Sequence, residues 1–275
     1  MAFEIVERVG GQTTDLIAGF GDFCTFAGRT FTWLFAGAFR ARTWRLLLPQ
    51  FYEVGVRSVP VVGVVGAFIG MVMAVETYSQ FAAIGQESRL GSIINLSVVK
   101  QIGPVLAAVM LAGRVGGALA AELGTMRVTE QIDAMRVMGS DPIQYLVVPR
   151  FLACVLLTPI LTAYSDVLGI AGGWLISVPF FHIPNNAYLY YSTHGGVDTW
   201  QVMEGIIKGF FFGGAIGLIS CYKGFHSGAG ASGVGRACTE SFVASFIAII
   251  IINFVFADVS KDLYVAIWGN RSIFG

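Results

Sequence analysis

Residues 59–85 read VPVVGVVGAFIGMVMAVETYSQFAAIG, and Glu76 is the only charged side chain among them. A helix that crosses a bilayer needs about 20 consecutive, predominantly apolar residues. This stretch is long enough, and it carries apolar side chains on every side of a helix rather than along one stripe. It therefore predicts a membrane-spanning helix from about residue 58 to residue 85.

The composition of the whole chain agrees with this prediction. Hydrophobic residues make up 55% of the 275 positions and charged residues 12%, with a mean hydropathy of +0.72, whereas soluble domains carry about 25% charged residues. The sequence thus predicts an all-α integral membrane protein that crosses the membrane several times. A five-span domain is expected over 51–275, with the other four spans at about 93–121, 151–181, 202–222 and 241–257.

Residues 1–50 are expected to form a separate helical segment at the membrane surface. Within 16–39 an aromatic stripe recurs at helical spacing, and arginines follow at 40, 42 and 45. This pattern is typical of an amphipathic helix that lies in the interface plane, although a sixth spanning helix is the alternative. The first residues have no basic region before a short apolar stretch, so we expect no cleaved signal peptide. The stripe consists of Leu16, Phe20, Phe23, Ala27, Phe31 and Leu34.

The distribution of Lys and Arg predicts the orientation of the spans. Short cytoplasmic loops carry an excess of these residues. They occur before the first span, in 122–150 and after the fourth span, whereas 182–200 has none. We therefore expect 122–150 to be cytoplasmic, and 182–200 and the C-terminus to lie outside.

Motifs of soluble catalysis and of nucleotide binding are missing from the sequence. The formal net charge is zero, which gives no reason to expect nucleic acid as a partner. No phosphate-binding P-loop motif or H-E-x-x-H pattern occurs, and the G-x-G-x-x-G register at 228–233 follows a predicted membrane helix, where a connector is expected. The four cysteines lack metal-site spacing and are expected to be packing residues. We expect no catalytic residue, metal or cofactor in this chain, and a lipid enzyme with clustered interfacial His or Asp is disfavoured.

Charged side chains inside the predicted spans are candidates for a functional site, and five of them are considered: Glu76, Lys100, Arg114, Asp166 and Lys208. A charge at the bilayer centre costs about 2.5–3.5 kcal/mol on insertion scales, so such residues are retained chiefly where they are paired or line a polar cavity. Lys100 and Lys208, near the outer ends of their spans, could together bind an anionic headgroup such as a phosphate, with Glu76, Tyr78 and Gln101 at a similar depth. Snorkelling to the headgroup zone is the alternative. We expect Arg114 and Asp166 to be structural or paired.

A polar block, ELGTMRVTEQIDAMRVMGSDPIQY at 122–145, separates the second and third spans. Thr125 can cap a short amphipathic helix, and Gly139 followed by Asp141-Pro142 can end it and turn the chain back. The apolar side of this helix would carry Val128, Ile132 and Met135. Such a helix could be a plain surface connector, or it could sit in a groove of a partner protein.

Residues 102–150 resemble the signature of the MlaE-type (YrbE-type) permeases, the membrane subunits of MCE phospholipid transport systems. Weaker likeness extends from about residue 55 to the C-terminus. One departure is Gln101, where some relatives have an acidic residue, so a local ion pair with Lys100 is not expected. The matching positions are Gly103-Pro104, Ala112-Gly113-Arg114, Ala121-Glu122, Gly124-Thr125-Met126, Thr129-Glu130-Gln131, Asp141-Pro142 and Pro149-Arg150.

The resemblance implies the permease of an ABC transporter in a bacterial inner membrane. It implies a homodimer with a lipid cavity between protomers, an MCE-domain protein on the outer side, and a separate ATPase subunit that binds the ATP. Residues 122–138 would be the coupling helix in the ATPase groove, and Lys100 and Lys208 would face the lipid headgroup. A secondary transporter or channel without an ATPase is the alternative. The expected ATPase-coupling residues are Glu122, Thr125, Met126, Arg127, Thr129, Glu130, Gln131 and Asp133.

Overall fold

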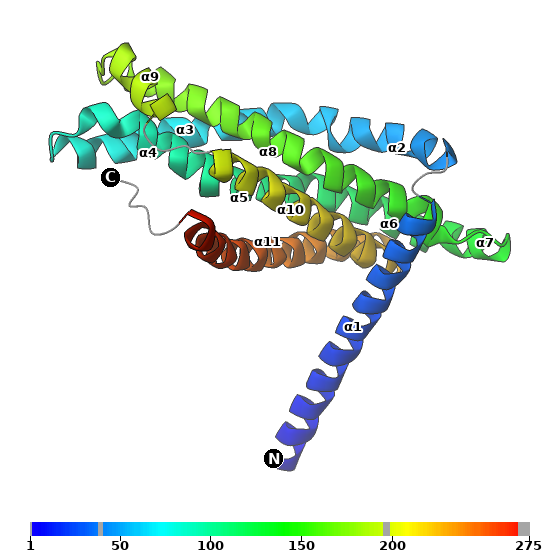
Figure 1. Ribbon diagram of the computed structural model, residues 1–275. Coiled ribbons are helices and arrows are strands. Elements are labelled where there is room, and N and C mark those ends of the chain that lie inside the picture. The colour runs from blue at the N-terminus through cyan, green and yellow to red at the C-terminus, as the bar shows by residue number, and fades with distance from the viewer. Residues whose placement is uncertain (1, 38–40, 195–198, 269–275) are drawn as a thin grey trace.

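The computed structural model describes residues 2–37, 41–194 and 199–268, and these ranges are helical with short connections and contain no strand. Most helices run along one another in an elongated bundle, while α1 leaves it at an angle (Figure 1). The elements are α1 (Ala2–Gly37), α2 (Ala41–Val54), η1 (Val56–Ser58), α3 (Val59–Ala82), η2 (Glu87–Arg89), α4 (Leu90–Ser97), η3 (Val98–Ile102), α5 (Gly103–Leu111), η4 (Ala112–Gly116), α6 (Gly117–Val128), α7 (Gln131–Val137), η5 (Ile143–Val147), α8 (Val148–Ser177), α9 (Asn185–His194), α10 (Thr199–Phe225) and α11 (Gly230–Trp268).

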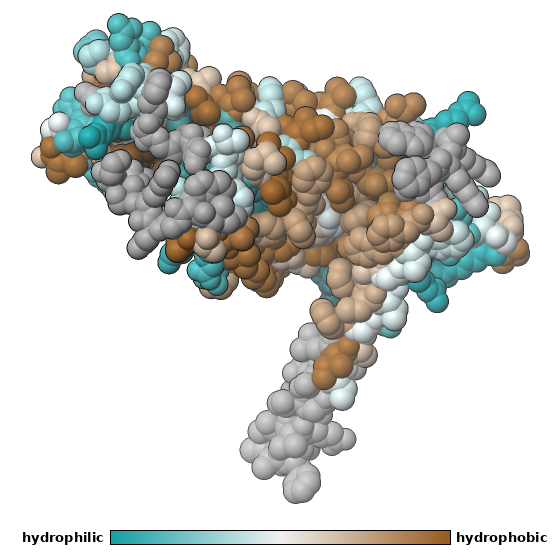
Figure 2. All heavy atoms as spheres, in the orientation of Figure 1, coloured by the Kyte–Doolittle hydropathy of each residue, from teal (hydrophilic) through white to brown (hydrophobic). Residues whose placement is uncertain are grey.

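All five predicted spans are confirmed. The described residues contain five helical stretches long and apolar enough to cross a membrane, and each overlaps one predicted span. The second, fourth and fifth extend beyond both predicted bounds, whereas the first and third begin earlier than predicted and also end earlier. Side chains over the middle of the bundle are apolar, and hydrophilic ones gather at its two ends (Figure 2). The chain is therefore a multi-pass membrane protein. The five stretches are Arg45–Ala82, Leu90–Val128, Ile143–Ser177, Thr199–Phe225 and Gly230–Ala266.

Glycines allow the helix backbones to approach closely, as the sequence predicts. A Cβ on Gly70 of α3 would overlap the carbonyl of Gly169 in α8, and one on Gly213 of α10 would overlap the carbonyl of Cys154. Lipid provides no hydrophobic force between helices, so close van der Waals packing has to hold the bundle together. Helix α8 is accordingly the central helix, with α3 on one side and α10 on the other (Figure 1).

Three turns of the bundle are π-helical. Lys100 lies in η3 and Arg114 in η4, within the second span, and η5 opens the third span. A π turn widens the helix and breaks its regular hydrogen-bond pattern, and such turns are frequent at functional sites. Lys100 and Arg114 thus occupy backbone that departs from the α-helix.

The four cysteines differ in exposure. Cys154 and Cys221 are buried packing residues, as predicted, and Cys238 is partly exposed. Cys24 on α1 is exposed, so for this residue the prediction is wrong. Neighbouring residues of α1 do contact the bundle: Phe23 and Phe26 pack against Tyr222.

Candidate functional site

The polar block forms a protruding helix at one end of the bundle, which we call the α7 end (Figure 1). It is not one helix over 122–138. Helix α6 continues the second span to Val128, Glu130 then adopts a left-handed conformation (φ 58°), and α7 follows over Gln131–Val137. Gly139 (φ 73°) ends it, as predicted. We call residues 122–142 the lever.

The predicted cap at Thr125 is wrong. Thr125 lies inside α6, where its hydroxyl donates to the carbonyl of Ala121 at 2.8 Å. The preceding residue, Gly124, lies against Ser227, which follows α10, and a Cβ on Gly124 would be 3.2 Å from the Ser227 Oγ. Gly124 therefore serves close packing rather than a helix break.

The root of the lever is buried and its tip is exposed. Ile132 has no exposed surface, and it belongs to a cluster with Leu123 and Phe225. Val137 and Met138, by contrast, are 89% and 73% exposed. Of the predicted apolar side, Ile132 faces inward and Val128 is exposed. The tip of the lever is thus apolar and exposed, whereas its root is packed into the bundle.

Polar contacts of the expected coupling residues stiffen the lever. Thr129 donates to the carbonyl of Thr125 at 2.9 Å, and Gln131 Nε2 donates to Thr129 Oγ1 at 3.0 Å. The Asp133 carboxylate lies 2.9 Å from Arg136 and 3.6 Å from Arg127. The structure therefore brings most of the expected coupling residues into two small networks, with Met126 packed on the root cluster and Glu130 exposed.

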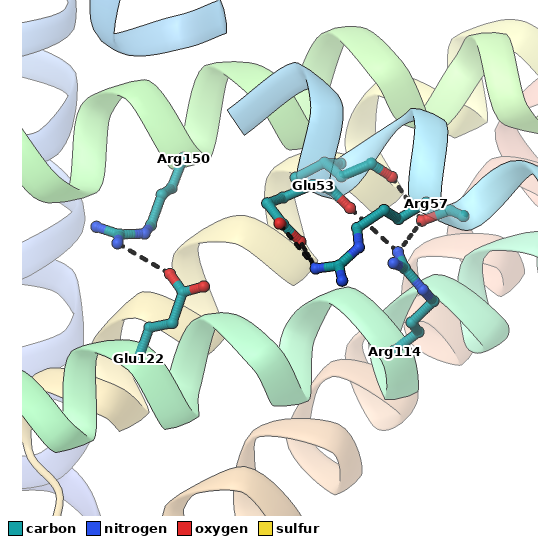
Figure 3. A network of polar contacts seen from close by, with 7 residues as sticks. Glu53, Arg57, Arg114, Glu122 and Arg150 are labelled. Carbon is teal, nitrogen blue, oxygen red and sulfur yellow. Dashed lines mark hydrogen bonds and ion pairs between the residues drawn. The ribbon is translucent and has the colours of Figure 1, made fainter. Parts of the chain in front are cut away.

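Two contacts tie the lever to other elements. Arg150 of α8 binds Glu122 of α6 at 3.0 Å (Figure 3) and also donates to the carbonyl of Leu146. Trp33 of α1 donates to the Asp141 carboxylate at 2.8 Å, and the other oxygen of Asp141 accepts from the amide of Ile143. Trp33 is 108 residues from Asp141, and Arg150 is 28 residues from Glu122, so local spacing gave no signal for either pair.

Arg114 is paired, as predicted. Its guanidinium donates to the Glu53 carbonyl at 3.1 Å and to Ser58 Oγ at 2.5 Å, while the Glu53 carboxylate binds Arg57 at 2.8 Å (Figure 3). Asp166 differs. It is 8% exposed and lies against Gly103, and its Oδ1 has no hydrogen-bond partner among the described residues.

A buried ion pair lies in α10. Lys208 has no exposed surface, and its ammonium is 2.7 Å from the Glu204 carboxylate. The ammonium also donates to the carbonyl of Lys100 at 3.2 Å and to Gln101 Oε1 at 3.3 Å. The second Glu204 oxygen accepts from Ser260 Oγ of α11 at 2.7 Å. We call these five residues the lysine cluster.

The structure thus places Lys100, Gln101 and Lys208 together, but the contact of Lys100 is made by its backbone. Sequence reasoning missed Glu204, although its spacing of four residues from Lys208 was the available signal. Glu204 is the acidic partner of Lys208, on the same helix. Glu76 is exposed on α3, and Tyr78 stacks on Phe181 with ring centroids 3.9 Å apart.

The glycine-rich stretch at 228–233 is only partly the predicted connector: residues 228 and 229 join two helices, whereas 230–233 already belong to α11. Gly230 (φ 73°) begins α11, and Gly233 packs against Gly228. Helices flank this stretch on both sides, so it lacks the strand that a dinucleotide site requires. Among the described residues, no group of three or more His, Cys, Asp or Glu side chains could hold a metal ion.

Comparison with known proteins identifies the family. The model of the family described as "Permease MlaE" matches residues 47–259. The chain belongs to the MlaE permease family. It is 38% identical over 258 residues to a probable ABC transporter permease protein of Rickettsia felis, a match that covers 94% of this chain and 98% of the relative.

Two further MlaE-family relatives agree. A probable ABC transporter permease protein of Synechocystis is 40% identical over 227 residues, covering 82% of this chain and 85% of the relative. The intermembrane phospholipid transport system permease protein MlaE of Haemophilus influenzae is 30% identical over 210 residues, covering 76% and 80%. The chain is thus a permease, the membrane component of an ABC-type transport system.

Proposed function

We propose that this permease moves glycerophospholipid between a bacterial inner membrane and an MCE-domain protein, driven by ATP hydrolysed on a separate subunit. The chain itself makes and breaks no bonds and binds no cofactor. The lever is the observation that carries this proposal. The phospholipid substrate is supported by the name of the Haemophilus relative and by the lysine cluster.

The lever has the shape that transmission of motion requires. The apolar tip at Val137 and Met138 can enter a groove of the ATPase. Because Ile132 is buried in the bundle, a movement of the tip would also move the root of the lever. The bonds from Glu122 to Arg150 and from Asp141 to Trp33 connect that root to α8 and α1. Movement of the ATPase would therefore reach the spans through defined contacts.

We place the partner copy of a homodimer on α11. Only 11% of the apolar window of α11 is buried, against 33% to 61% for the other spans. The exposed side chains include Phe242, Phe246, Ile250 and Phe254. In the homodimer, this face of α11 would border the lipid cavity.

Helix α1 would lie in the membrane interface, since α1 is not among the five candidate spans.

Reconstitution with the ATPase tests the proposed function. Glu130→Lys should leave ATP hydrolysis active but separate it from lipid movement, because the substitution reverses a charge on the exposed turn of the lever. Glu87→Lys, the same charge reversal on an exposed residue of η2, is the matched control and should transport normally. Full coupling in Glu130→Lys would refute the proposal.

One observation favours the alternative of an ATPase-independent secondary transporter. The buried Asp166 carboxylate, with an oxygen that lacks a hydrogen-bond partner among the described residues, is a type of group found in proton relays. That mechanism predicts lipid movement driven by a proton gradient in vesicles that contain this chain alone. Transport that requires the ATPase and ignores the gradient would exclude it.

A further inference from the structure

Three oxygen atoms of the lysine cluster surround the buried ammonium. Lys208 forms an ion pair with Glu204 Oε1 and donates hydrogen bonds to the Lys100 carbonyl and to Gln101 Oε1. A lipid phosphate can reach Lys208 only by replacing one of them. Glu204 is the charged acceptor, so exchanging it for a phosphate keeps the charge beside Lys208 constant.

This exchange creates a second requirement at Glu204. Its side chain is 3% exposed, and a buried carboxylate that loses its cation is strongly destabilising. Ser260 would remain bonded to it, but a hydroxyl does not neutralise charge. Lys100 contributes only its carbonyl to the cluster, and its side chain is partly exposed. A new cation therefore has to accompany the incoming phosphate.

We propose that Glu204 is a specificity-determining residue that selects phospholipids with a zwitterionic headgroup. The phosphate of such a lipid would pair with Lys208, and its ammonium would pair with the displaced Glu204. A headgroup that carries a phosphate without a cation would satisfy Lys208 and leave Glu204 as an unpaired buried charge. The inference rests on the proposed function, because it assumes that phospholipid enters this cluster.

Competition between two lipids tests the inference. The purified permease is incubated with equal amounts of phosphatidylethanolamine and phosphatidylglycerol of matched chains, and bound lipid is measured by mass spectrometry. The native chain should retain the ethanolamine lipid in preference. In Glu204→Gln the ratio should shift about tenfold toward the glycerol lipid, because the amide needs no cation. Asp262→Asn neutralises an exposed carboxylate of α11 and should leave the ratio unchanged.

An unchanged ratio in Glu204→Gln would overturn the inference. The double variant Glu204→Gln/Lys208→Met tests the underlying site separately, and it introduces no unpaired buried charge that could prevent folding. It should lose most bound phospholipid of both types. If the double variant binds as much lipid as the native chain, the lysine cluster is not the lipid site, and the role proposed for Glu204 is refuted as well. Loss of lipid in the double variant together with an unchanged ratio in the single variant would refute only the role of Glu204.

Discussion

At the scale of single residues, the charged side chains of the spans are satisfied in different ways: Arg114 has a partner distant in sequence, whereas the charged partner of Lys208 is four residues away. The free-energy cost of inserting a charge into the bilayer indicated that the side chains of Arg114 and Lys208 needed polar or charged partners. This cost did not indicate that Arg114 would bind the carbonyl of Glu53, or that Glu204 would bind Lys208 and Ser260. Residue type therefore predicted the need for a partner, and tertiary packing decided which partner it was.

The pair between Arg150 and Glu122 should stabilise the bundle. The Arg150 side chain is 9% exposed and that of Glu122 is 48% exposed. Glu122→Gln leaves a nearly buried guanidinium without its carboxylate, and we expect a loss of about 1–2 kcal/mol, less than for a fully buried pair because water screens Glu122. Thermal unfolding in detergent measures this change.

The exposed pair between Arg57 and Glu53 provides the control. Both side chains are more exposed than Arg150, so Arg57→Gln should lower the melting temperature much less than Glu122→Gln. Equal effects of the two substitutions would show that Glu122 does not hold Arg150 in place.

At the scale of elements, the sequence predicted the number and order of the spans because their apolar length is a strong signal. Helix ends were predicted less well. Thr125 was expected to start a helix, but α6 continues the second span through it to Val128. Glu130, at which the chain does break, has no residue-type signal, since left-handed backbone favours Gly or Asn.

Close packing between α3 and α8 makes Gly70 intolerant of a side chain. A Cβ there would overlap the Gly169 carbonyl, and the backbones would have to separate. Gly70→Ala should therefore destabilise the protein by about 1–3 kcal/mol or more, as overpacking does. Gly28→Ala on α1 is the matched control, because a Cβ at that position meets nothing within 4 Å. A Gly70→Ala variant with the same melting temperature as the native chain would contradict the tight contact between α3 and α8.

At the scale of the whole molecule, the bundle has two chemically different ends. The α7 end carries the lever, and the opposite end carries α9 (Figure 1). The lysine cluster lies within the bundle, in contacts between α10, η3 and α11. A signal from the lever would have to travel along the spans to reach it, and the second span connects the two directly, since it contains both Lys100 and the start of the lever.

The most direct test of this proposal is the location and partner of the lever tip. Val137→Cys and, as a control at the other end, Leu189→Cys are introduced into a Cys24→Ser/Cys238→Ser chain, since both positions are exposed and the native Cys24 and Cys238 are exposed or partly exposed. A membrane-impermeant thiol reagent should label Val137→Cys only from the cytoplasmic side and Leu189→Cys only from the outer side. Val137→Cys should also cross-link to the ATPase subunit. Labelling of Val137→Cys from the outer side, or no cross-link in the intact complex, would contradict the role of the lever.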